Sequence, residues 1–293
     1  MPSLRDIRKR IASVKNTRQI TKAFKMVSAA KLRRAQEAIV LARPYAQHME
    51  QVLGSLATRA DLSAHPLLAV RPVRKVELVL LTSDRGLCGG FNANVIRRAQ
   101  KFLVEGPAAG YLKIELSTLG RKGQAFSARR KLAVRRDYPG IFERLQYSVA
   151  EGIAGELASH YVDAELDAVF LLYNEFRSAV SQRVSLVQLL PIVPQPVVEA
   201  ARTDGYLPVD YLYEPSRAAV LDALLPQHLA MQLWRAMLES VASEHGARMT
   251  AMDSATNNAR DMIDRLTLQF NRARQAYITK ELMEIVSGAE AQK

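Results

Sequence analysis

Two long segments, one near each end of the chain, carry an apolar or small residue at every third or fourth position. The first covers residues 1–58 and the second covers residues 216–289. In the first segment the mean repeat of about 3.5 residues is the spacing of helices that wind around each other in a left-handed coiled coil, and the second segment also steps by three or four residues. The pattern therefore predicts two long helices of the coiled-coil type.

The expected contact positions differ in character between the two segments. Pro44 interrupts the first segment and is expected to bend or end its helix, whereas Gly288 is the expected end of the second. The first series is Leu4, Ile7, Ile11, Val14, Thr17, Ile20, Phe24, Val27, Lys31, Ala35, Ala38, Ala42, Tyr45, Met49, Val52 and Leu56. The second is Leu229, Leu233, Ala236, Ser240, Ser243, Ala247, Ala251, Ala255, Ala259, Met262, Leu266, Phe270, Ala273 and Tyr277. The many Ala and Ser residues of the second series favour close helix approach with little buried area.

The region between the two helices, residues 75–195, alternates short β-rich runs with amphipathic stretches. Strands are expected at residues 76–82, 112–119, 168–173 and 183–190, and helices at residues 92–103, 122–130 and 147–162. This alternation indicates an α/β domain, Rossmann-like, with a mostly parallel sheet. A proline-dense stretch with Pro191, Pro194, Pro196 and Pro208 is interpreted as the linker that leaves it.

The two terminal helices differ in length. If both start at the α/β domain, about 17 residues of the second helix, roughly 25 Å, extend beyond the first. Five apolar residues near this end cover a roughly 160° arc, while Lys280, Glu281 and Glu284 lie opposite. These five are Ile278, Leu282, Met283, Ile285 and Val286. A single helix of this length is marginal in water, so the apolar tip is expected to need an external partner.

Charge and cysteine content indicate which partners and which compartment the chain could have. The formal net charge is +12, and residues 1–58 hold twelve basic residues against three acidic ones. A basic helix could meet nucleic acid, anionic lipid or an acidic protein surface. The single cysteine, Cys88, and the absence of any apolar run of roughly 20 residues indicate a reducing, cytoplasmic compartment and at most a peripheral membrane role.

Three sequence blocks resemble the gamma subunit of bacterial F-type ATP synthases. They are IASVKNTRQITKAFKMVSAAKL at residues 11–32, SDRGLCGGFN at residues 83–92 and ITKELMEIVSGAEA at residues 278–291. The last block fits the family's C-terminal signature, and the resemblance covers essentially the whole chain.

The resemblance implies an antiparallel coiled coil that turns as the central rotor shaft inside a hexamer of alpha and beta subunits. It implies that the α/β domain contacts the epsilon subunit and the membrane c-ring, and that proton-driven rotation is coupled to ATP synthesis on the partner subunits, at the cytoplasmic face of the bacterial inner membrane. The implied contacts with catalytic subunits are Lys22, Phe24, Met26, Arg274, Gln275, Thr279 and Glu281. Most members have Met where this chain has Phe24.

Other functions were weighed against this one. Residues 83–92 lie where a phosphate-binding loop would lie, but they match neither G-x-G-x-x-G nor G-x-x-x-x-G-K-[ST], so a tight glycine turn is the favoured interpretation. The histidines show no metal-ligand spacing, and no catalytic residues, cofactor or metal are expected. A basic coiled coil that binds nucleic acid remains the alternative, although its basic residues lie all round the helix and no aromatic residues are interleaved with them.

Overall fold

The computed structural model describes residues 3–57, 65–143, 145–193, 213–214 and 216–290. They form two compact units. One contains residues 30–247, and the other combines residues 1–29 with residues 248–293. The long helices α1 (Leu4–Ala57) and α5 (Arg217–Glu290) each contribute residues to both units.

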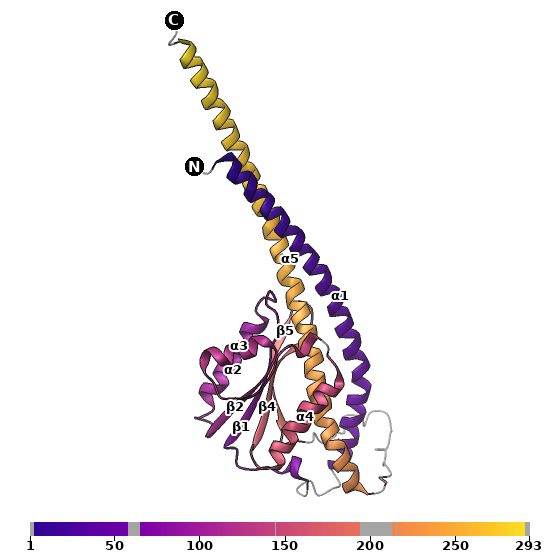
Figure 1. The fold of residues 1–293 in the computed structure, drawn as a ribbon. Coiled ribbons are helices and arrows are strands. Elements are labelled where there is room, and N and C mark those ends of the chain that lie inside the picture. The colour runs from indigo at the N-terminus through magenta and orange to yellow at the C-terminus, as the bar shows by residue number, and fades with distance from the viewer. Residues whose placement is uncertain (1–2, 58–64, 144, 194–212, 215, 291–293) are drawn as a thin grey trace. The chain divides into compact units, whose positions relative to one another are not determined.

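The unit of residues 30–247 is built on a five-stranded sheet in the order β3-β2-β1-β4-β5 (Figure 1). The strands are β1 (Lys75–Leu81), β2 (Lys113–Leu119), β3 (Val134–Tyr138), β4 (Ala168–Phe176) and β5 (Gln182–Leu190). The pairs β1–β2, β1–β4 and β2–β3 are parallel, and only β4–β5 is antiparallel. The predicted mostly parallel sheet is therefore confirmed.

Helices cover both faces of this sheet, which explains the continuous apolar run of β1. On one face, α2 (Phe91–Glu105) and α3 (Arg121–Arg130) pack on Val76, Leu78 and Leu80. On the other face, α4 (Tyr147–Val162) and parts of α1 and α5 pack on Val79 and Leu81. Two short 3-10 helices, η2 (Pro66–Leu68) and η3 (Ile141–Glu143), complete the unit.

The predicted strands and helices of this domain are confirmed to within one to three residues, but β3 was missed. Its sequence, VRRDY, is short and charged, and none of its residues is fully buried. Arg135 of β3 pairs with three carboxylates from other parts of the chain, those of Glu77, Glu115 and Glu165. Because those partners are distant in sequence, local hydrophobic pattern gave no sign of a strand. Pro194, Pro196 and Pro208 of the predicted linker lie outside the described residues.

Pro44 does not end the first helix, because α1 continues to Ala57. The proline ring cannot donate a backbone hydrogen bond to Val40, but both residues are exposed, so water can satisfy the free carbonyl group. The second helix also runs two residues beyond the expected stop at Gly288, to Glu290.

In its described residues, the other unit contains Ser3 and the ends of α1 and α5, and the two helix ends run antiparallel. Thr256 Oγ1 donates a hydrogen bond to Thr21 Oγ1 at 2.8 Å, and Lys25 Nζ lies 2.6 Å from Asp253 Oδ1. Further along, the Arg8 guanidinium lies 5.5 Å from the centre of the Phe270 ring. Residue numbers fall on α5 as they rise on α1, so the predicted antiparallel coiled coil is confirmed.

The predicted contact series of α1 is wrong in its central part. Ile20, Phe24 and Val27 are 56%, 45% and 53% exposed, and Thr17 and Lys31 are also exposed. The buried positions are Thr21, Ser28, Leu32 and Ala35. The true series follows heptads through polar side chains, which the search for apolar residues passed over. On α5, Ile263 is buried in place of the expected Met262, and Tyr277 is exposed.

Candidate functional site

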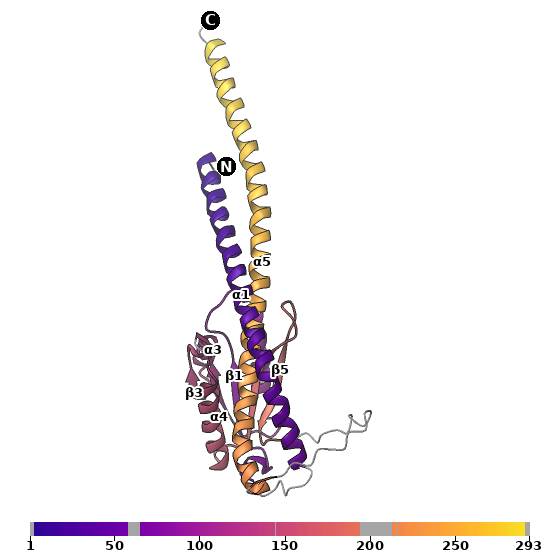
Figure 2. The same cartoon turned by 90° about the vertical axis from the view of Figure 1, so that its right-hand side faces the viewer.

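The end of α5 is a single exposed helix. Every residue from 274 to 287 is exposed, and both views draw this end of α5 extending past the N-terminal end of α1 (Figures 1 and 2). The five apolar tip residues, Ile278, Leu282, Met283, Ile285 and Val286, are 47–63% exposed. This agrees with the expected overhang.

The polar face of the tip is also as expected. Lys280 Nζ lies 3.5 Å from Glu284 Oε1, one turn away. The exposed residues Arg274, Gln275, Thr279 and Glu281, predicted to contact partners, belong to the same helix end. Thr279 Oγ1 donates a hydrogen bond to the backbone oxygen of Gln275 at 3.0 Å, which leaves its methyl group free to face outward. The tip thus combines an apolar arc with a charged one.

A second exposed group lies on α1. The three predicted contacts here, Lys22, Phe24 and Met26, are all exposed. At 100° per residue, Phe24 shares a stripe with Ile20 and Val27, about 100° from the buried positions. Lys22 and Met26 lie on the opposite flank of the same buried series. The structure therefore separates the predicted α1 contacts into two flanks and adds Ile20 and Val27, which sequence reasoning had assigned to the helix–helix contact.

The two groups are far apart along the shaft. Lys25 of α1 pairs with Asp253, and Arg274 lies 21 residues beyond Asp253 on α5 (274 − 253). At 1.5 Å per residue this is about 30 Å. A partner that surrounds the coil at residues 20–27 of α1 is therefore a different contact zone from one that surrounds the tip.

The loop of residues 83–92 forms several hydrogen bonds within the chain, although Asp84 Oδ2 is buried without a hydrogen-bond partner among the described residues. The Ser83 amide donates to Asn92 Oδ1 at 2.9 Å, and Asn92 Nδ2 donates to Ser83 Oγ at 2.7 Å. Asp84 Oδ1 accepts hydrogen bonds from the amides of Arg121 and Gly140, at 3.0 and 2.8 Å. Asp84 therefore accepts a hydrogen bond from the first residue of α3, whereas the helix that follows the loop itself is α2. Gly89 has a φ of 56°, as expected for a tight turn.

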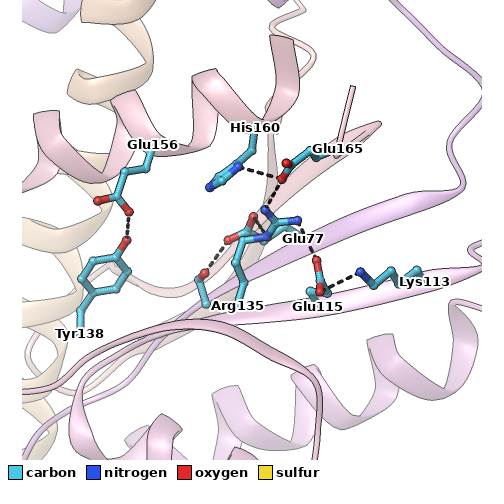
Figure 3. Close-up of polar contacts among 9 residues, drawn as sticks. Glu77, Lys113, Glu115, Arg135, Tyr138, Glu156, His160 and Glu165 are labelled. Atoms are coloured by element: carbon cyan, nitrogen blue, oxygen red, sulfur yellow. Dashed lines mark hydrogen bonds and ion pairs between the residues drawn. The ribbon is translucent and has the colours of Figure 1, made fainter. Parts of the chain in front are cut away.

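A cluster of charged side chains on the sheet combines carboxylates, a guanidinium group and an imidazole ring (Figure 3). Arg135 of β3 contacts Glu115 at 2.7 Å, Glu165 at 2.9 Å and Glu77 at 3.4 Å. Glu165 also contacts His160 Nδ1 at 2.9 Å, and Ser117 donates a hydrogen bond to Glu77. The cluster ties β1, β2, β3 and α4 together.

The titration behaviour of this cluster follows from burial and pairing. Burial raises the pKa of Glu77, and the Ser117 hydrogen bond and the charge of Arg135 offset only part of this effect. Burial also raises the pKa of Glu115, but hydrogen bonds from Lys113 and Arg135 hold it below the usual value. Perturbed pKa values can mark catalytic sites. Here the Glu77 side chain is only 1% exposed, so its carboxylate is closed to solvent and serves the ion pair with Arg135.

The described parts of the chain contain neither a metal-binding cluster nor a membrane-spanning helix. No group of three or more His, Cys, Asp or Glu side chains there is arranged to hold a metal ion. Among the same residues, no helix is both long and apolar enough to span a bilayer. The candidate functional site consists of the exposed tip of α5 and the two exposed flanks of α1.

Comparisons with known proteins point to one family. A family model described as ATP synthase matches residues 3–292. The ATP synthase gamma chain of Anaeromyxobacter sp. (strain Fw109-5) is 62% identical over the whole of both chains, and that of Geobacter metallireducens is 55% identical over the whole of both. Both are bacterial proteins of the same length class.

Solved structures share the fold. The rotor of the Euglena gracilis mitochondrial ATP synthase contains a chain 22% identical, with a TM-score of 0.63, covering 94% of this chain and 98% of the other. A second structure of that enzyme, with its c-ring, gives a TM-score of 0.67 at 21% identity, covering 99% and 94% of the two chains. From the family match and the close bacterial relatives, the chain belongs to the ATP synthase gamma chain family.

Proposed function

We propose that this chain is the central rotor shaft of an ATP synthase and that it turns inside a hexamer of alpha and beta subunits. Rotation of a membrane c-ring, driven by protons, is coupled through the shaft to ATP synthesis on the catalytic subunits, and hydrolysis drives the reverse rotation. In this role the chain is itself non-catalytic. The observation that carries the proposal is the exposed apolar end of α5.

That end of α5 is not stable as an isolated element. A helix of about fourteen residues without tertiary contacts is marginal in water. Burial of each large aliphatic side chain contributes about 1.5–3 kcal/mol, so a ring-shaped partner that encloses Ile278, Leu282, Met283, Ile285 and Val286 would stabilise the helix. A sleeve that grips an apolar surface without directional bonds also lets the shaft rotate within it.

The two flanks of α1 support a rotary mechanism. Ile20, Phe24 and Val27 present an apolar stripe on one side, and Lys22 and Met26 present a mixed surface on the other. Subunits arranged around the coil therefore meet chemically different faces at one moment. As the shaft turns, each subunit meets each face in sequence, and differential contact energy changes its nucleotide affinity.

The α/β domain is the proposed attachment to the epsilon subunit and the c-ring. In this arrangement the chain lies at the cytoplasmic face of the bacterial inner membrane as a peripheral component. The close relatives are bacterial ATP synthase gamma chains, and no described helix is able to span the membrane. The membrane attachment is therefore proposed to be through the c-ring.

Isolation of the tagged chain from the native membrane tests the assembly. We expect two nucleotide-binding subunits of about equal size in threefold excess over this chain, and recovery of nucleic acid without them would contradict the proposal. The second test is Arg274→Glu with Gln275→Ala in the assembled enzyme. Because both residues are exposed, folding should change by less than about 0.5 kcal/mol, while ATP-driven rotation and proton pumping both fall.

The matched control makes the same chemical changes on another helix. Arg34→Glu with Gln36→Ala alters two exposed residues of α1 outside both proposed contact zones. We expect this enzyme to assemble and pump protons at the rate of the unmodified enzyme. Full pumping by the Arg274 and Gln275 variant would remove these residues from the proposed contact, and loss of helicity would show that they stabilise the helix instead.

A further inference from the structure

The loop of residues 83–92 matches no phosphate-binding motif, so its glycine turn requires another explanation. Its hydrogen bonds are internal, as described above, and it follows β1 at the carboxyl edge of the sheet. Its apolar side faces α5. Cys88 and Phe91, 2% and 3% exposed, form one buried cluster with Ala247. The loop is therefore packed against the long helix.

A chain of buried hydrogen bonds joins the same helix to the sheet. Ser243 Oγ donates to the backbone oxygen of Asn174 in β4 at 3.0 Å, and Asn174 Nδ2 donates to the backbone oxygen of Phe91 at 3.4 Å. Ser243 and Asn174 are 0% and 2% exposed. Ser243 and Ala247 are four residues apart on α5, so they lie on one face of the helix. One turn of α5 thus contacts both β4 and the start of α2.

Gly246 brings the helix into contact with the β4–β5 connection. A Cβ atom at this position would lie 3.1 Å from the backbone oxygen of Ala179 and 3.2 Å from its Cα. The contact is with backbone atoms, which cannot rotate away as a flexible side chain can. Absence of a side chain at position 246 therefore allows α5 to touch the β4–β5 hairpin, and both views draw β5 beside α5 (Figures 1 and 2).

These three contacts fall within a single turn of α5. The apolar cluster, the Ser243 hydrogen bond and the close approach at Gly246 connect it to α2, β4 and the β4–β5 hairpin. Rolling of α5 about its own axis would break the buried hydrogen bond and move Gly246 off Ala179. Beyond this turn, α5 continues as one helix to its tip.

We propose that the 83–92 loop, Asn174 and Ala179 form with Ser243, Gly246 and Ala247 a clasp that transmits torque between the α/β domain and the shaft helix. The inference rests on the proposed rotor function, since a clasp that carries torque requires rotation. Ser243 and Gly246 are positioning residues in this scheme. They fix the angle of the helix relative to the sheet and touch no nucleotide.

The test uses the assembled ATP synthase with two substitutions in the clasp and two matched controls. Ser243→Ala removes the buried hydrogen bond, and Gly246→Val places a branched side chain against Ala179. Ser240→Ala removes a buried hydroxyl group one turn earlier on α5. Unlike Ser243, Ser240 forms no hydrogen bond with the described part of the sheet. Gly152→Val adds the same bulk on α4, where a Cβ meets nothing within 4 Å.

Two readouts separate torque transmission from simple stability. Amide exchange of residues 243–247 and of the β4–β5 hairpin reports local opening, and Ser243→Ala should raise it about fivefold, the effect of losing about one net hydrogen bond. Angular fluctuation of a probe on the α/β domain, with the catalytic subunits immobilised and held by Mg-ADP, reports torsional stiffness. Its variance is inversely proportional to stiffness and should increase for both clasp variants but for neither control.

The outcomes are distinct. Increased angular variance with assembly and ATP hydrolysis retained supports the clasp, and increased amide exchange with unchanged variance overturns it. If Gly246→Val fails to assemble, Ser243→Ala alone decides between these results. If the unmodified enzyme itself shows no ATP-driven rotation of the probe, the rotor function fails, and the clasp fails with it.

Discussion

His228 should make the stability of the chain depend on pH in the mildly acidic range. The side chain is 8% exposed on α5. Gln232 Nε2 lies 2.7 Å from His228 Nε2, so with the amide as donor the imidazole is neutral and accepts the hydrogen bond at this nitrogen. Burial lowers the pKa of His228 to about 4.

The sign follows from linkage. The folded-state pKa is lower than the ordinary value of 6.5, so the unfolded chain takes up the proton first as the pH falls. The contribution of neutral His228 to the free energy of unfolding is fully present above pH 6.5 and is lost progressively between pH 6.5 and about 4. The pKa values of the unfolded and folded states differ by about 2.5 (6.5 − 4), which corresponds to about 3 kcal/mol of free energy of unfolding. About 2 kcal/mol of this free energy is lost between pH 7 and pH 5.

Urea denaturation of the purified chain at pH 7 and pH 5 measures this loss. The only tryptophan, Trp234, packs edge-on against Tyr147 with 6.1 Å between ring centres, so its fluorescence reports unfolding near His228. His228→Gln cannot take up the proton and should lose about 2 kcal/mol less than the unmodified chain over this range. His48→Gln, which removes an exposed histidine of α1, should behave as the unmodified chain. Equal losses in the unmodified chain and His228→Gln would refute the reasoning.

Three further experiments with substituted chains test the charge cluster and the coiled coil. Arg135→Met should reduce the free energy of unfolding by about 3–5 kcal/mol because it leaves buried Glu77 without its cation, and adding Glu77→Gln should restore part of this in urea denaturation. Thr21→Cys with Thr256→Cys should form an intramolecular disulfide on oxidation, because the two hydroxyl oxygens are 2.8 Å apart. Non-reducing electrophoresis detects this disulfide, and Phe24→Cys with Thr256→Cys should not form one. Phe24→Asn should change the free energy of unfolding by less than about 0.5 kcal/mol, since the side chain is outside the helix contact; a larger loss would return Phe24 to the buried series.

The α/β domain was predictable because its strands are buried on both faces. Six of the seven residues of β1 are buried, so its sequence is almost continuously apolar and has turn residues on either side. The start and end of α4 were predicted without error. In contrast, β3 is held at the edge of the sheet by ion pairs such as Arg135 with Glu77, 58 positions apart (135 − 77). Pairings across such a separation leave no local pattern.

The same reasoning explains which parts of the candidate site were predicted. The tip was predictable because its apolar arc and its charged arc are both visible at helical spacing, with no partner helix to obscure them. The α1 contacts were harder, since Ile20, Phe24 and Val27 have the composition of a buried series and the actual series contains Thr21 and Ser28. Only the cross-helix contacts of Thr21 and Lys25 decide between the two faces. The Ser243 to Asn174 contact likewise joins elements that no sequence spacing connects.

The arrangement of polar and apolar groups in the coil determines where its binding energy lies. A hydrogen bond such as that between Thr21 and Thr256 contributes about 0.5–1.5 kcal/mol net, whereas burial of a large apolar side chain contributes about 1.5–3 kcal/mol. The chain therefore places the weaker interaction inside the coil at this level and leaves Ile20, Phe24 and Val27 outside, where a surrounding partner can bury them. In the proposed function, the apolar free energy of Ile20, Phe24 and Val27 is then available to the contact between shaft and partner. A partner can gain or lose this contact as the shaft turns, while the paired helices keep the register set by Thr21, Lys25 and their partners on α5.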